Sequence, residues 1–120
     1  MDTAALAIAF TAMLKAGQHI EAAQRFNAAD IVSLEAMPGD MAICRGTAAV
    51  KAKSDWWYDN HTIHSFETGD ALVNGDQFLL RFVIDVTRLY SGERVKAEEY
   101  GLYTVRDGKI VEERFFYPTA

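Results

Sequence analysis

The sequence of 120 residues is poor in cysteine, proline and long apolar runs. Its single cysteine, Cys44, excludes an internal disulfide and is typical of a reducing compartment, so we expect a cytoplasmic location. No apolar run approaches the roughly 20 residues that a membrane-spanning helix needs, so no membrane partner is expected. Lys and Arg number 12 against 17 Asp and Glu. This acidic balance argues against a nucleic-acid partner, because phosphate binding needs clustered cations.

The sequence also lacks the glycine-rich, P-loop, zinc and nucleophile-elbow motifs that bind cofactors or activate a nucleophile. His61 and His64 are three residues apart, and such residues point to opposite faces of a strand, so they should not chelate one metal ion. No cofactor is therefore expected. Half of the residues are apolar, which is enough to build a core, and the length predicts one domain over 1–120.

What the sequence does contain is a strong β-hairpin signal near its end. Asp107-Gly108 separates two runs, within 95–117, that are rich in Val, Tyr, Leu and Phe. Further turn signals predict strands at 62–68, 71–73 and 77–87. In the longest of these, alternate residues should form a core face: Phe78, Leu80, Phe82, Ile84 and Val86. The second half of the chain is therefore predicted to be an antiparallel meander.

Three helices are predicted before this meander, at about 2–16, 19–26 and 47–60. Ile20, Ala23 and Phe26 should form the inner face of the second helix, and Thr47 should be the N-cap of the third. Between them, 30–35 reads as a short strand and 37–44 as a loop. Strands that follow helices indicate the α+β class. We expect a cone-shaped domain in which the three helices pack on a curved, mostly antiparallel sheet around a pocket.

Four stretches of the sequence resemble the nuclear transport factor 2-like superfamily, with its SnoaL-like and ketosteroid isomerase-like domains. They are 14–17 (LKAG), 26–35, 45–50 (RGTAAV) and 107–116. The resemblance implies the cone fold, a pocket for a small hydrophobic molecule, and a homodimer paired through the sheet face. It also implies cofactor-free proton transfer, although this fold hosts many activities.

Ketosteroid isomerase, a member of this superfamily, has its general base near the end of the first strand, where this sequence has Glu35. The oxyanion hole of that enzyme is a tyrosine and a protonated aspartic acid. The corresponding residues here are Phe10 and Gly101, which have no proton to donate, so steroid isomerisation itself is not expected. Glu99 lies two residues before Gly101, on the same strand face, and is a possible substitute.

Three residues are candidates for catalysis. Glu35 could be a general base whose pKa an apolar pocket raises, or a carboxylate that faces water. His64 is expected to share a strand face with Phe66 and could enter the pocket as a donor or proton carrier, or be a hydrogen-bonded sheet histidine. Tyr103 could replace the missing oxyanion tyrosine, or serve only in aromatic packing.

Phe10, Trp57 and Phe82 are expected to shape the pocket walls, with Glu99 as a further substrate-binding residue. The usual meaning of the acidic pairs on the last two strands, Glu98, Glu99, Glu112 and Glu113, is a solvated or dimer-facing surface. Val83, Tyr100 and Leu102 give the outer sheet face an apolar patch that favours a homodimer.

Two functions therefore stay open. One is a pocket protein that isomerises, cyclises or dehydrates a small hydrophobic carbonyl compound, with Glu35 as the base and Tyr103 or His64 as the donor. The other is a non-catalytic module for ligand binding or dimerisation, which the missing oxyanion residues favour.

Overall fold

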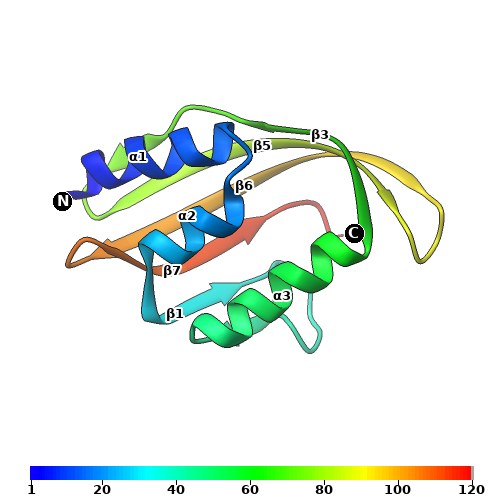
Figure 1. Ribbon diagram of the computed structural model, residues 1–120, viewed down its shortest axis with the longest axis horizontal. Coiled ribbons are helices and arrows are strands. Elements are labelled where there is room, and N and C mark those ends of the chain that lie inside the picture. Colours follow the sequence, from blue (N-terminus) through cyan, green and yellow to red (C-terminus); the bar gives the residue numbers. More distant parts are fainter. Residues whose placement is uncertain (120) are drawn as a thin grey trace.

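The computed structural model describes residues 1–119, and these fold into three helices and one seven-stranded sheet. The elements follow in the order α1 (Thr3–Lys15), α2 (His19–Phe26), β1 (Asn27–Leu34), β2 (Ile43–Arg45), α3 (Thr47–Asp59), β3 (His61–Thr68), β4 (Leu72–Asn74), β5 (Gln77–Arg88), β6 (Arg94–Arg106) and β7 (Lys109–Phe116). The helices lie on one face of the curved sheet (Figure 1). The predicted α+β cone is confirmed.

The sheet has the strand order β2-β1-β7-β6-β5-β3, and β4 pairs with the end of β5. Its one parallel pair, within the described residues, joins β1 to β7 and so brings the first strand beside the last. This pair places Ser33 opposite Glu113. The predicted loop at 37–44 is wrong in part, because β2 begins at Ile43 and pairs antiparallel with β1.

Two local predictions about the helices are corrected by the structure. Ile20 is 42% exposed while Ala22 is fully buried, so the inner stripe of α2 runs through Ala22 and Phe26, one turn apart. The N-cap of α3 is Gly46 rather than Thr47. Gly46 has a φ of 85°, which a glycine adopts without strain, and its N–H donates to the carbonyl of Ile31.

The core fills the space between the helices and the concave face of the sheet. Its largest members are Leu6, Phe10, Leu14, Phe26, Ile31, Phe78, Leu80, Phe82, Ile84, Val86, Tyr103 and Ile110. The predicted inner face of β5 is therefore confirmed. Burial of each such side chain stabilises the fold by about 1.5 to 3 kcal/mol, so the sheet holds the polar side chains beside the core in fixed positions. None of the helices within 1–119 is long and apolar enough to cross a membrane.

Candidate functional site

Six polar side chains gather where α3 faces the concave side of the sheet, beside β1, β7 and β6. We call them the lysine cluster: Ser33, Glu35, Lys53, Glu99, Glu113 and Tyr117. Five of them come from the sheet or from residues that directly follow a strand, and only Lys53 comes from a helix. The cluster thus brings together residues from 33 to 117 that are far apart in the sequence.

Lys53 is the centre of the cluster. Its Nζ donates to Glu35 Oε1 at 2.9 Å and also to the hydroxyl of Ser33. The same ammonium lies 5.3 Å from the centre of the Phe115 ring, a distance at which a cation–π attraction operates. The Lys53 side chain is 12% exposed and that of Glu35 is 25% exposed. The ion pair is therefore shielded from water on most sides, which strengthens it and makes loss of one partner costly.

Glu35 is held at both of its oxygens. Oε1 accepts from Lys53, and Oε2 accepts from the Tyr117 hydroxyl at 2.7 Å. Burial, together with this hydrogen bond and the charge of Glu35, raises the pKa of Tyr117 to about 12, so its hydroxyl keeps its proton. Glu35 therefore sits among polar partners in a fixed orientation, which matches neither of the two alternatives from the sequence, an apolar pocket or a carboxylate that faces water.

The charge of Glu35 also acts on two further carboxyl groups, those of Glu99 and Glu113. Burial and the charge of Glu35 raise the pKa of Glu99 to about 7. Burial also raises the pKa of Glu113, although Lys53 and the Ser33 hydroxyl act in the opposite direction. Glu113 was expected on a solvated surface. That expectation is wrong, because Glu113 pairs with Ser33 and Tyr103, two buried residues of the neighbouring strands, and so points inward with them.

Tyr103 lies deeper in the cone and is only 3% exposed. Its ring stacks on Phe78 at 4.9 Å and lies 5.1 Å from Phe10. Burial, with the charges of Glu113 and Glu99, raises its pKa well above the usual range of a tyrosine. Gly101 makes room for this ring, because a Cβ at 101 would lie 2.8 Å from Cε2 and 2.9 Å from the hydroxyl of Tyr103. Tyr103 is therefore a protonated hydroxyl close to the carboxyl groups of the cluster.

His64 does not belong to this group of residues. The pairing of β3 with β5 shifts register between Ile63 and Ser65, so His64 falls at an irregular position. Its Nε2 lies 2.7 Å from Thr87 Oγ1, and the ring is exposed on the outer face of the sheet. The expectation that His64 shares the face of Phe66 is wrong, because this bulge breaks the alternation. Of the two alternatives for His64, the hydrogen-bonded sheet histidine fits its contact with Thr87.

The three expected wall residues are aromatic groups of the core and its edge. Phe10 and Phe82 are buried, and Phe82 contacts the Phe66 ring at 5.5 Å. Trp57 is partly buried and stacks on His61 at 4.6 Å, with the two planes 17° apart. Of the site residues proposed from the sequence, Glu35 and Glu99 belong to the lysine cluster and Tyr103 lies close to it, whereas Lys53, Glu113 and Tyr117 were not proposed. Only Lys53 carried a local signal, because it lies four residues before Trp57 on α3, which places the two side chains on one side of the helix.

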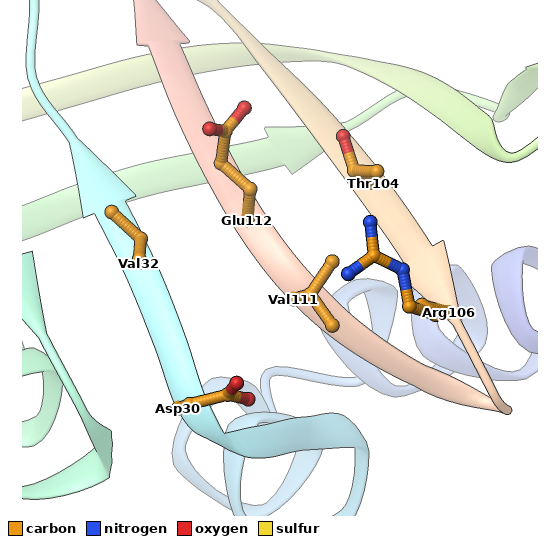
Figure 2. A pocket seen from close by; sticks show the side chains of 6 residues that line it. All are labelled: Asp30, Val32, Thr104, Arg106, Val111 and Glu112. Carbon is orange, nitrogen blue, oxygen red and sulfur yellow. The ribbon is translucent and has the colours of Figure 1, made fainter.

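The opposite face of the sheet carries a hollow of about 340 Å³. Residues of β1, β6 and β7 line it, and Figure 2 shows them: Asp30, Val32, Thr104, Arg106, Val111 and Glu112. A second hollow of about 220 Å³ lies along β4, β5 and β6. Neither hollow includes a residue of the lysine cluster. Within 1–119, no group of three or more His, Cys, Asp or Glu side chains is arranged to hold a metal ion.

Comparison with known proteins identifies a family and several solved structures that this chain is similar to. A family model described as a SnoaL-like domain matches residues 1–117. A solved structure from Mesorhizobium loti, named as a candidate SnoaL-like polyketide cyclase, is 51% identical, with 98% of this chain and 100% of that chain covered and a TM-score of 0.95. No curated protein matches the chain.

Two more distant structures agree in fold. An NTF2-like protein from Burkholderia xenovorans is 19% identical, with 98% of this chain and 89% of that chain covered and a TM-score of 0.79. A candidate polyketide cyclase from Pseudomonas putida is 16% identical, with 98% and 92% covered and a TM-score of 0.71. At such identities the likeness bears on the fold alone.

Proposed function

The chain belongs to the SnoaL-like domain family, and from this premise we propose that it is a cofactor-free acid–base enzyme. Its substrate is a small, mostly hydrophobic carbonyl compound, which it isomerises, cyclises or dehydrates. The observation that carries the proposal is the geometry of the lysine cluster, where Lys53 and Tyr117 donate to the two oxygens of Glu35. Burial and the charge of Glu35 raise the pKa of Glu99 to about 7, which supports it.

Glu35 is the general base in this proposal. It takes a proton from the carbon next to the substrate carbonyl, and Lys53 and Tyr117 hold it in place for that transfer. The oxygen of the carbonyl then gains negative charge and needs hydrogen-bond donors. The Tyr103 hydroxyl supplies one, because burial raises its pKa well above the usual range, and Glu99 supplies the other in its protonated form, which its pKa of about 7 makes available at neutral pH and below. A neutral carboxylic acid is an effective donor in such a site.

Exchange of a carbon-bound proton for deuterium tests this proposal without knowledge of the product. We would follow a panel of enolisable ketones and esters in D2O by NMR. Glu35→Gln should slow exchange by about 10²- to 10⁴-fold, the usual contribution of a general base. Glu93→Gln removes an exposed carboxylate in the turn after β5 and should leave the rate unchanged. A panel on which the wild type is no faster than Glu35→Gln refutes the assignment.

A second candidate is a module without chemistry, for ligand binding or dimerisation. The observation that favours it is the dense aromatic packing of Phe10, Phe78 and Tyr103 inside the cone. This candidate predicts that no compound of the panel exchanges faster with the protein than without it.

We also propose that two copies pair through the outer sheet face. Val83, Tyr100 and Leu102 are partly buried there, and the ion pairs of Arg81 with Glu98 and of Arg94 with Asp85 surround them. A homodimer would cover this patch, and sedimentation at micromolar concentration checks it: a monomer rejects the pairing.

A further inference from the structure

The larger hollow on the outer face of the sheet lies where the pairing of β7 with both of its neighbours is irregular. Four residues of β1, 28–31, lie opposite a single residue of β7, Val111. Val111 is also the extra residue of β7 at the register shift against β6. These two bulges border the hollow, which Asp30 and Val111 line and whose volume is about 340 Å³. Bulges of this kind re-aim side chains and often lie next to binding sites.

The charged side chains of this hollow come from three neighbouring strands. In the part of the chain that the structure describes, neither Arg106 of β6 nor Asp30 of β1 forms an ion pair. The third charged residue of the lining, Glu112, lies 3.9 Å from Arg114. Figure 2 shows Arg106 and Asp30 on either side of Val111. One cation and one anion are thus left for a ligand.

The rest of the lining offers one hydroxyl and two apolar side chains. Thr104 Oγ1 accepts from Gln77 Nε2 at 3.1 Å, so its own hydrogen can donate to a ligand beside Arg106. Val32 and Val111 provide the apolar surface. A volume of about 340 Å³ lies within the range of roughly 300 to 1,000 Å³ that is usual for small-molecule sites.

We propose that this hollow binds a small zwitterion whose ammonium and carboxylate stand at opposite ends of a short carbon chain. The Arg106 guanidinium donates to both oxygens of the carboxylate, and the Asp30 carboxylate accepts from the ammonium. β1 and β6 are two strand spacings apart, or about 10 Å, so the two charges of the ligand are several bonds apart. The carbon chain between them contacts Val32 and Val111.

Neither the proposed chemistry nor the proposed pairing of two copies uses this hollow. The lining shares no residue with the lysine cluster, so proton exchange there does not depend on it. The apolar patch lies farther along the outer face, because Arg106 is six residues beyond Tyr100, or about 20 Å along β6.

NMR titration at neutral pH with three compounds of matched length tests the proposal: 4-aminobutanoate, butanoate and butylamine. An exposed ion pair contributes up to roughly fivefold in affinity, so the zwitterion should bind about threefold more tightly than either singly charged compound. Arg106→Gln should weaken binding of 4-aminobutanoate and butanoate by about threefold and leave that of butylamine unchanged. Asp30→Asn should weaken binding of 4-aminobutanoate and butylamine by about threefold and leave that of butanoate unchanged.

Arg88→Gln and Glu93→Gln are the matched controls. They remove the two charges of an exposed ion pair in the turn between β5 and β6, at the other end of β6 from Arg106, and should change none of the affinities. Equal affinities of the three compounds, or no binding of the zwitterion, overturn the site. An Arg106→Gln variant that binds butylamine as much more weakly as butanoate also overturns it, because the effect would then not depend on the ligand carboxylate.

Sedimentation separates the ligand site from a contact between two copies. Arg106→Gln and Asp30→Asn should sediment as the wild type does. If the wild type is a dimer and either variant is a monomer, the two charges belong to a contact between copies, and the proposal of a ligand site is overturned.

Discussion

Replacing Glu99 by glutamine should stabilise the protein at alkaline pH, although the change removes a charged group from the lysine cluster. Burial and the charge of Glu35 raise the pKa of Glu99 from 4.5 to about 7 in the folded state. Between these two values the folded state binds more protons than the unfolded state, so the free energy of unfolding falls as the pH rises. The cost of the Glu99 charge is absent below pH 4.5 and fully present above pH 7.

The size of this effect follows from the two pKa values. A difference of about 2.5 pKa units corresponds to about 3 kcal/mol. Glu99 is partly buried, so contact with water reduces the cost to about 2 kcal/mol. Glu99→Gln should therefore raise the free energy of unfolding by about 2 kcal/mol at pH 8.5 and leave it unchanged at pH 4. In a domain of this size the gain corresponds to about 8 °C in Tm.

Urea unfolding between pH 4 and pH 8.5, followed by tryptophan fluorescence, measures the effect. The control is Glu98→Gln, one residue away on the outer face. Hydrogen bonds from Arg81 and Tyr100 lower the pKa of Glu98 to about 2 in the folded state. At pH values above the pKa of Glu98 in the unfolded state, its charge therefore stabilises the protein, and Glu98→Gln should destabilise it at pH 8.5. The pKa of Glu113 is also raised. The free energy of unfolding of the Glu99→Gln variant should therefore still fall as the pH rises, but by less than that of the wild type.

Two results would refute this reasoning. The first is a difference between Glu99→Gln and the wild type that stays constant from pH 4 to pH 8.5, since Glu99 would then have no raised pKa. The second is a loss of stability at pH 8.5, which would mean that the Glu99 carboxylate makes favourable contacts as an anion.

Three further changes test other parts of the site. Gly101→Ala should lower the free energy of unfolding in urea by about 1 to 3 kcal/mol, because the alanine Cβ would lie 2.8 Å from the Tyr103 ring. An unchanged free energy would mean that this ring can move away without cost. Lys53→Met should lower the free energy of unfolding by about 2 kcal/mol at pH 8, because it leaves the Glu35 carboxylate without its cation. An unchanged Tm in thermal unfolding would contradict a stabilising ion pair between the two residues. His64→Ala should leave proton exchange unchanged, because His64 lies on the outer face, and a loss above tenfold would place it in the mechanism.

The sequence predicted those features of the fold that depend on neighbouring residues. The alternation from Phe78 to Val86 identified the buried face of β5, and Asp107-Gly108 identified the turn between β6 and β7. Helix boundaries followed from local signals such as Asp2, whose carboxylate accepts from the Ala5 N–H at 2.8 Å. Each of these features is decided within a few residues of chain, so one sequence was enough.

The lysine cluster could be predicted only in part because it depends on pairings far apart in the chain. Ser33 and Glu113 are 80 positions apart, and only the parallel register of β1 and β7 brings them together. The Tyr117 hydroxyl reaches Glu35 from 82 positions away. The bulge that turns His64 outward is likewise a product of sheet pairing. Alternation along a strand gives the face of a residue only while the register stays regular.

The two positions that the resemblance matches to the oxyanion donors of ketosteroid isomerase, Phe10 and Gly101, are connected in space. Phe10 and Gly101 both contact the Tyr103 ring: Phe10 lies 5.1 Å from it, and Gly101 leaves the space that its hydroxyl occupies. The hydroxyl lies 2.9 Å from the place where a side chain at 101 would begin. An aspartic acid at 101 and Tyr103 in its present position therefore exclude each other. The donor that we propose, Tyr103, is therefore on the sheet and occupies the space that a longer side chain at 101 would need, and the proposed chemistry depends on its hydroxyl.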